Sequence, residues 1–394
     1  MTVQNIWSFF ILPTLLSFAF QFLRKSIKWK REKRSQEPSR LFWLGRGNGI
    51  FADARSKLLA FVKGRQLFAD AYFKYSRENL IIKISTISVP LVLVPKNQRK
   101  WFFKERSNVL DHRATGFDAV ESLYTMPCGH ILDFPAHVKL IHKVLTRELP
   151  NLTDNLVREI EEGLLKNWGS DTKKWQGIEL WDTVLILVTR TFNRISVGIH
   201  TSSFTTVNML LDSLSRLDVF NVMKEEIGTT YQQNKCKWTK PVVDDLKFTD
   251  NVLRESMRLS GPIVRLIREV NAENGIQLNG VSLPKGTKIA TDMHNMHRDE
   301  EIYKDANTFN PFRLNPSTGK PMPPAVETSE NFLPFGHGRH GCPGRYFASH
   351  EIKLIIATIV MKYDIKFLDK RPPNVWMGDS MIPPHTILSV KRRS

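Results

Sequence analysis

The chain has 394 residues, of which 41% are hydrophobic and 24% charged, a composition that permits a sizeable core and argues against wholesale disorder. Its three cysteines include no CxxC pair, which argues against a disulfide framework or a structural zinc site. The net charge of +18 favours an acidic partner, an anionic membrane surface or nucleic acid.

The first predicted element is an N-terminal membrane anchor. Residues 6–23 form an 18-residue run without an ionisable side chain, about the minimum length for a helix to cross the hydrocarbon core. Seven basic residues follow at once, which places the C-terminal side in the cytosol. A cleaved signal peptide is the alternative, disfavoured because the positive charge follows the apolar run. We expect an anchor over 1–23, a basic linker over 24–45 and one globular domain over 46–394.

Short strands and many helices are predicted within this domain. Apolar alternation over 80–94 and over 276–290 predicts strands joined by turns at Pro90 and at Asn279-Gly280. Apolar residues three and four apart predict helices over 133–149, 155–168, 178–197, 205–226, 244–259 and 348–363. The predicted fold class is therefore mainly α with a small β-sheet.

Three tryptophans, Trp168, Trp175 and Trp181, are candidates for stacking on nucleic-acid bases. They do not alternate with basic residues along one surface, so we interpret them as core residues. The expected partners therefore do not include nucleic acid.

Two arginines and a glutamate follow in the next predicted helix and strand. Glu255 and Arg258 stand at i and i+3 in NVLRESMRLSG, a spacing that also suits an ordinary surface ion pair. Arg265 follows ten residues after Glu255 in GPIVRLIREV, and an exposed strand arginine is its plainer interpretation.

The most informative segment is FGHGRHGCPGR, residues 335–345, in which four glycines surround Cys342. A predicted helix begins directly afterwards, so the amide donors and dipole of its N-terminus favour a thiolate over a thiol. Gly338, Gly341 and Gly344 let the backbone pass close to a flat ligand.

Three interpretations of this loop compete. A phosphate-binding loop would want Lys-Ser or Lys-Thr after the glycines, where the chain has Arg345-Tyr346. A nucleophilic cysteine could use His337 or His340 as its base, although catalytic partners are seldom so close along a chain. The third is a heme-thiolate ligand.

Phe335, Gly338, Cys342 and Gly344 match the cysteine-loop signature of the cytochrome P-450 family, and FGHGRHGCPGRYFA resembles its fungal, membrane-bound branch. This resemblance implies a heme whose iron is bound by Cys342. One position departs, because His340 stands where the family usually has an arginine paired with a heme propionate. That contact is weakened unless His340 is protonated.

The resemblance implies further roles for residues upstream. FNPFRL, residues 309–314, is similar to the family's meander, whose arginine, here Arg313, joins Glu255 and Arg258 in a buried scaffold triad. Arg265 falls where relatives offer an arginine to a heme propionate.

The segment 196–208, SVGIHTSSFTTVN, resembles the distal helix over the heme. There Thr201, preceded by His200, would hold the water that delivers protons to iron-bound dioxygen. A mid-helix threonine bonded to a backbone carbonyl is the structural alternative.

The likeness is incomplete around residues 189–198. RTFNRISVG resembles the end of a helix before the substrate roof, and GIHTSS resembles the middle of the distal helix. On the order of a hundred residues that usually form the roof helices are therefore expected to be absent. Their loss would leave the heme more exposed to water.

The resemblance implies a single-pass endoplasmic reticulum protein with a cytosolic heme-thiolate monooxygenase domain. An NADPH-dependent flavoprotein reductase would supply electrons, and the substrate would be an apolar small molecule, with a terpenoid-type secondary metabolite as one candidate. The alternative is a truncated heme-binding remnant without turnover.

Overall fold

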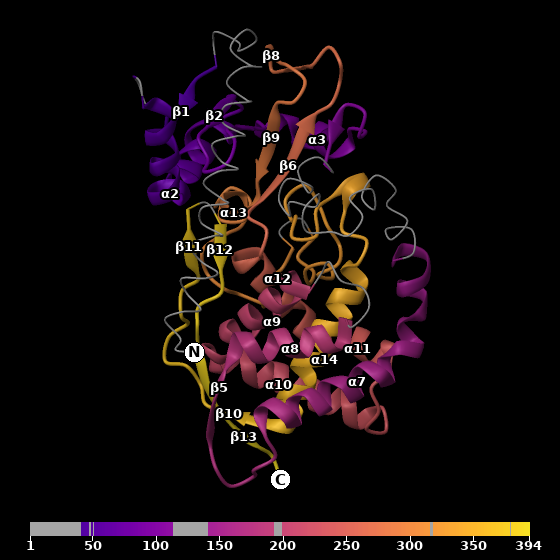
Figure 1. Cartoon of the computed structure of the whole chain (residues 1–394). Coiled ribbons are helices and arrows are strands. Elements are labelled where there is room, and N and C mark those ends of the chain that lie inside the picture. The colour runs from indigo at the N-terminus through magenta and orange to yellow at the C-terminus, as the bar shows by residue number, and fades with distance from the viewer. Residues whose placement is uncertain are drawn as a thin grey trace, which may run out of the picture.

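The computed structural model describes residues 41–46, 49, 51–112, 141–192, 199–315, 318–378 and 380–394. The expected anchor over 1–23 and nearly all of the expected linker lie outside these residues. Within the described part of the chain, no helix combines the length and the apolar character that crossing a bilayer requires. A sheet-rich region lies at the top of Figure 1 and a helical region below it.

A six-stranded mixed sheet, in the order β1-β2-β3-β9-β6-β4, forms the upper region (Figure 1). Its strands are β1 (Trp43–Leu44), β2 (Ile82–Ile84), β3 (Leu91–Leu93), β4 (Leu110–Asp111), β6 (Arg265–Val270) and β9 (Lys288–Asp292). Helix α2 (Ala52–Ala71), continued by η1 (Tyr72–Ser76), packs on this sheet. Ile82 and Ile84 of β2 share a buried apolar cluster with Leu67 and Phe68 of α2, so the predicted alternation has its inward face against this helix.

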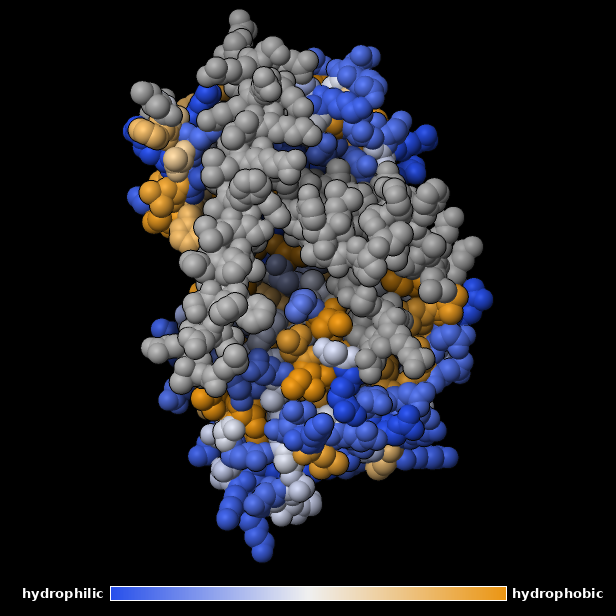
Figure 2. All heavy atoms as spheres, viewed as in Figure 1, coloured by the Kyte–Doolittle hydropathy of each residue, from blue (hydrophilic) through white to orange (hydrophobic). Residues whose placement is uncertain are grey.

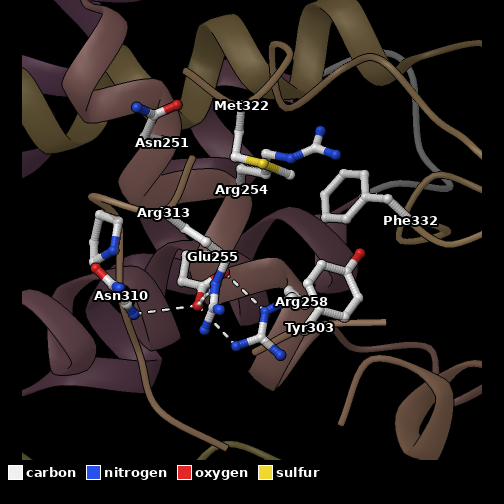
Figure 3. Close-up of a pocket in the computed structure, with 10 residues that line it drawn as sticks. Asn251, Arg254, Glu255, Arg258, Tyr303, Asn310, Arg313, Met322 and Phe332 are labelled. Carbon is white, nitrogen blue, oxygen red and sulfur yellow. Dashed lines mark hydrogen bonds and ion pairs between the residues drawn. The ribbon is translucent and has the colours of Figure 1, made fainter. Parts of the chain in front are cut away.

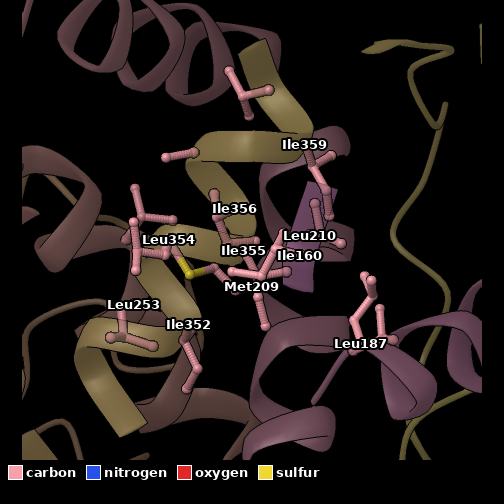
Figure 4. Close-up of a cluster of buried hydrophobic side chains, with 14 of the residues drawn as sticks. Ile160, Leu187, Met209, Leu210, Leu253, Ile352, Leu354, Ile355, Ile356 and Ile359 are labelled. Atoms are coloured by element: carbon pink, nitrogen blue, oxygen red, sulfur yellow. The ribbon is translucent and has the colours of Figure 1, made fainter. Parts of the chain in front are cut away.

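The helical region contains the larger core. Its helices are α7 (Thr146–Trp168), α8 (Leu180–Phe192), α9 (Ile199–Leu214), α10 (Leu217–Gln233), α11 (Lys240–Asp244), α12 (Lys247–Ser260) and α14 (Arg345–Lys362). Helix α14 is the central element: residues of every turn from Phe347 to Val360 are buried, as expected for a helix that is apolar nearly all round. Figure 4 shows Ile352 and Ile356 of α14 among side chains from neighbouring helices, including Met209 of α9.

Shorter elements complete the fold. They are η2 (Lys96–Gln98), α3 (Arg99–Lys104), η4 (Ile141–Leu145), α13 (Met293–Met296), η5 (Gly338–His340), β5 (Gln176–Glu179), β7 (Ile276–Leu278), β8 (Val281–Leu283), β10 (Tyr363–Ile365), β11 (Val375–Met377), β12 (Ser380–Ile382) and β13 (Ile387–Arg392). β10, β13 and β5 form a three-stranded sheet, and β11 with β12 forms a hairpin.

The predicted strands are confirmed as β2 and β3 and as β7, β8 and β9, whereas several helix boundaries were wrong. Helix α7 runs through Pro150, because Leu149 and Leu156 on either side of it are buried in the common core. The helix predicted over 205–226 is two helices, because Arg216 has an extended backbone with φ of −139° and ψ of 91°. Apolar periodicity continues across this break and conceals it.

The tryptophan prediction was right for Trp168, which is fully buried, and wrong for Trp175, which is 42% exposed. The ammonium groups of Lys366 and Lys391 lie 5.2 and 5.3 Å from the Trp175 ring centroid. This tryptophan therefore stacks with surface lysines of the three-stranded sheet rather than filling the core.

Candidate active site

Cys342 lies between η5 and the first turn of α14. Its amide donates to the carbonyl of Phe335 at 2.7 Å, which closes the glycine-rich segment into a loop. Gly344 is the N-cap residue of α14. The amides of Gly344 and Arg345 donate to the Cys342 sulfur, so the predicted convergence of helix N-terminal donors on this sulfur is present.

Two opposing effects act on the protonation of this sulfur. Burial raises the pKa of the Cys342 thiol, and the two amide donors and the Arg345 charge lower it by less. The loop alone therefore favours the thiol. A thiolate at this position needs a further positive charge, and a bound iron ion would supply one.

The loop glycines serve two different purposes. Gly338 has φ of +71°, and a Cβ on it would lie 2.5 Å from the carbonyl oxygen of Phe103 in α3, so this glycine permits close backbone packing rather than ligand approach. A Cβ on Gly344 would have Ile141 as its nearest neighbour at 4.0 Å, and one on Gly341 would meet ordinary contacts from 3.5 Å outward. With respect to the described residues, space beside the cysteine is therefore open at Gly341 and Gly344, which fits a flat cofactor against the loop.

His340 is a partly buried imidazole in contact with a second histidine. Its ring centroid lies 3.9 Å from that of His112, with 30° between the ring planes. Burial, with the nearby His112 and Arg268, lowers the pKa of His340 to about 4, so it is neutral at pH 7. Among the described residues its Nε2 is buried without a hydrogen-bond partner. Such an orphaned atom fits an absent polar group, and a heme carboxylate is one that a ring N–H can bind.

The remaining predicted site residues lie on α9 and β6. Thr201 and His200 are exposed in the first turn of α9, and the Thr205 hydroxyl donates to the Thr201 carbonyl at 2.8 Å. Arg265 begins β6, with its guanidinium 4.0 Å from the ring centroid of Phe68.

One apolar cluster joins the α9 and β6 segments. Phe204, one turn after Thr201, is buried with Val264, the neighbour of Arg265, and with Met381 of β12. The structure therefore brings the distal-helix residues and the predicted propionate arginine to one neighbourhood.

The predicted scaffold triad is present, with Glu255 and Arg258 buried and Arg313 partly buried (Figure 3). Arg258 donates from Nε and Nη2 to the two carboxylate oxygens of Glu255, at 2.8 and 2.7 Å. Arg313 Nε lies 3.3 Å from Glu255 Oε1, which also accepts from the amide of Asn310 at 3.1 Å. The side chains of Glu255 and Arg258 are almost inaccessible, so the pair is not the surface ion pair that its spacing alone would also allow.

The triad ties α12 to the segment that precedes the cysteine loop. Arg258 donates to the carbonyl of Ala306 at 2.6 Å and to those of His297 and Thr308. His297 Nε2 in turn accepts from the amide of Leu333, two residues before Phe335, at 3.2 Å. Two successive hydrogen bonds, from Arg258 to the His297 carbonyl and from the Leu333 amide to His297 Nε2, thus connect the triad to the residues just before the loop.

Sequence reasoning missed Glu351. It lies on α14, is fully buried, and accepts a hydrogen bond from the Thr191 hydroxyl of α8. Burial raises its pKa to about 8, although hydrogen bonds from Thr191 and Ser202 oppose the shift. The only sequence signal is an acidic residue in a helix rich in apolar residues, and this signal does not say what faces it.

Comparison with known proteins identifies the class. The cytochrome P-450 family profile matches residues 102–389, so the chain belongs to the cytochrome P-450 family, whose members bind heme iron through a cysteine thiolate. The chain is 35% identical over 192 residues to cytochrome P-450 monooxygenase 151 of Postia placenta, covering 47% of this chain and 38% of that protein. It is 33% identical over 245 residues to cytochrome P-450 monooxygenase lnaC of Aspergillus flavus, covering 60% and 45%.

A third relative differs from this chain in length over the aligned region. Cytochrome P-450 monooxygenase htyF of Aspergillus rugulosus is 26% identical over 463 aligned positions, which cover 82% of this chain and 68% of that protein. Since 82% of 394 residues is about 323, about 140 aligned positions have no counterpart here. This number is of the same order as the loss predicted from residues 189–198. The chain spans less than half the length of the first two relatives.

Proposed function

We propose that this chain is a heme-thiolate monooxygenase that oxidises an apolar small molecule, with Cys342 as the axial ligand of the heme iron. The supporting observation is a half-buried sulfur that receives two amide hydrogen bonds at the start of α14, beside glycines that leave room for a flat group. A heme bound there would supply dioxygen activation, which electron donation from the thiolate promotes.

The residues around the sulfur would bind and orient the heme. His340 would donate a hydrogen bond to one heme carboxylate as a neutral imidazole, and Arg265 would pair with a carboxylate as a cation. Phe335 and Gly344 would border the heme face within the loop, and Gly338 would hold the loop against α3.

Residues of the first turn of α9 would handle protons. The Thr201 hydroxyl would hold a water molecule and pass its proton toward the heme, with the His200 imidazole beside it as a second exchangeable group. The substrate would bind on this side, near the apolar cluster of Phe204, Val264 and Met381.

The proposed setting is the endoplasmic reticulum membrane, with a single N-terminal span and a cytosolic domain. A flavoprotein reductase would take electrons from NADPH, and the net charge of +18 would suit docking of an acidic partner. The relatives named above are fungal monooxygenases, and the proposed substrate is an apolar small molecule, with a terpenoid-type secondary metabolite as the candidate.

The reduced carbon monoxide difference spectrum tests the ligand. Wild type should show the Soret band of a thiolate-bound heme, and Cys342→Ser should lose it. Cys236→Ser is the matched control, because Cys236 is an exposed free cysteine on another surface. An unchanged spectrum in Cys342→Ser would refute the assignment.

A heme-binding remnant without turnover is the second candidate, favoured by the roughly 140 aligned positions that this chain lacks. In microsomes that contain reductase, a working enzyme would consume NADPH in a substrate-dependent way and release an oxidised product. A thiolate spectrum without such consumption, across a panel of apolar substrates, would favour the remnant.

A further inference from the structure

The cavity shown in Figure 3 contains a cation that takes no part in the triad. The cavity lies between α12 and the segment that precedes the cysteine loop, is small and partly open to solvent, and is lined by the triad together with Asn251, Arg254, Met322 and Phe332. Figure 2 shows hydrophilic residues, in blue, over much of the lower part of the molecule, where Figure 1 places the helical region and where water can solvate their charges. Arg254 is by contrast only 6% exposed, and buried charges in proteins are usually paired.

Arg254 is held rigidly but keeps part of its guanidinium free. Its Nη1 donates to the carbonyls of Pro324 at 3.0 Å and Glu327 at 3.2 Å, and the guanidinium lies 3.6 Å from the ring centroid of Phe332. Within the described part of the chain, its Nε and Nη2 make no hydrogen bond. These two N–H groups form the edge of a guanidinium that binds both oxygens of a carboxylate side by side.

The carboxylates near Arg254 are already engaged or solvated. Asp250, Glu255 and Glu327 act on its charge through space, yet no carboxylate of the described residues forms an ion pair with it. Asp250 pairs with Lys353 at 3.3 Å, Glu255 belongs to the triad, and Glu327 is exposed. Burial lowers the pKa of Arg254 by more than these charges raise it, so a bound anion would offset the cost of burying this cation.

Asn251 adds a second polar group to the cavity. It precedes Arg254 by three residues on α12, a spacing that places both side chains on one face of the helix. Its side-chain amide makes no hydrogen bond with any described residue, so its N–H groups are available to an anion oxygen. Met322 and Phe332 provide apolar walls that suit a short carbon chain.

We infer that this cavity binds the carboxylate group of a small organic acid, with its two oxygens on Nε and Nη2 of Arg254 and the Asn251 amide as a further donor. Since Pro324, Glu327 and Phe332 lie in the segment before the cysteine loop, the ligand adds a link between α12 and that segment. The site contains neither the heme nor its cysteine ligand, so the inference stands independently of the proposed function.

Saturation-transfer NMR of the full-length protein in a neutral detergent tests the inference, with acetate as the probe. Saturation passed from the protein to the acetate methyl protons is compared between wild type and Asn251→Asp at constant ionic strength. An aspartate three residues before Arg254 would repel acetate or occupy the free guanidinium edge itself, so the affinity for acetate should fall about tenfold or more. Asn221→Asp makes the same charge change at an exposed position of α10 and should keep the wild-type signal.

Arg254→Lys separates a paired-donor site from a general attraction to positive charge. Lysine keeps the charge but lacks the paired N–H edge, so acetate should bind this variant about tenfold more weakly. Absence of saturation transfer to acetate in wild type, or equal signals in wild type and Asn251→Asp, would overturn the inference. The readout requires no heme, so it can succeed where the carbon monoxide spectrum fails, and the reverse also holds.

Discussion

Replacing Glu351 by glutamine should stabilise the protein at neutral pH. The carboxyl group is fully buried between α14, α8 and α9, and its pKa is raised from 4.5 to about 8. Between these two pH values the folded state holds a proton that the unfolded state releases. The wild-type free energy of unfolding therefore falls as pH rises through this window, by about 1.4 kcal/mol per pH unit.

The size of the effect follows from the same shift. At pH 7 the unfolded carboxyl is ionised and the folded one is still mostly neutral, which costs about 3 kcal/mol relative to a neutral side chain of the same shape. Glutamine does not titrate, and its amide can still pair with the hydroxyls of Thr191 and Ser202. Glu351→Gln should thus match wild type near pH 4.5 and exceed it increasingly up to pH 8.

Urea unfolding followed by tryptophan fluorescence at pH 5, 6, 7 and 8 measures this difference. Glu225→Gln is the matched control, since Glu225 is exposed on α10, and it should keep the wild-type pH dependence. Parallel curves for wild type and Glu351→Gln, or a less stable variant at pH 8, would show that the carboxylate is favourably solvated or paired and would refute the reasoning.

Three further predictions concern stability. Gly338→Ala should destabilise the fold by several kcal/mol in thermal or urea unfolding, because Gly338 has a positive φ and an added Cβ would lie 2.5 Å from a carbonyl oxygen of α3. The control is Gly228→Ala on α10, where the space around the Cβ position is open, and it should be neutral or stabilising by about 1 kcal/mol. Arg258→Ala leaves the buried Glu255 carboxylate without its main partner and should lower the free energy of unfolding by about 3 to 5 kcal/mol. The control is Lys74→Ala, which breaks an exposed ion pair and should lower it by less than about 1 kcal/mol. Burial lowers the pKa of His350 from 6.5 to about 4, so between these pH values the unfolded state binds a proton that the folded state does not. The free energy of unfolding therefore falls by up to about 3 kcal/mol as the pH falls from 6.5 toward 4. His350→Gln should flatten that acid limb in urea midpoints measured at pH 7, 6 and 5.

Local patterns predicted much of the fold and the loop. Glycines around one cysteine before a helix predicted where Cys342 lies, and the i, i+3 spacing with the FNPFRL segment predicted the Glu255, Arg258 and Arg313 triad. These features depend on residues close together in sequence or on a family motif, so they can be predicted without knowing which distant segments pack against them.

Properties set by distant surfaces were not predictable. The role of Gly338 depends on a carbonyl of Phe103, 235 positions earlier in the chain. The thiol pKa of Cys342 and the carboxyl pKa of Glu351 depend on burial by several helices at once. Charge state therefore had to wait for the structure: desolvation opposes a thiolate at Cys342 in the loop alone, and the iron that the family binds through this cysteine would favour it.

The contacts that hold the cysteine loop bear on the two candidate functions. They come from α3, from α12 through the triad and His297, and from the buried face of α14. These elements all lie outside the junction between α8 and α9, where the roof helices are expected to be absent. Heme binding and substrate coverage therefore rest on different parts of the chain. A chain without the roof can keep a thiolate-bound heme and still lose coupled oxidation, so the carbon monoxide spectrum and the NADPH assay answer independent questions.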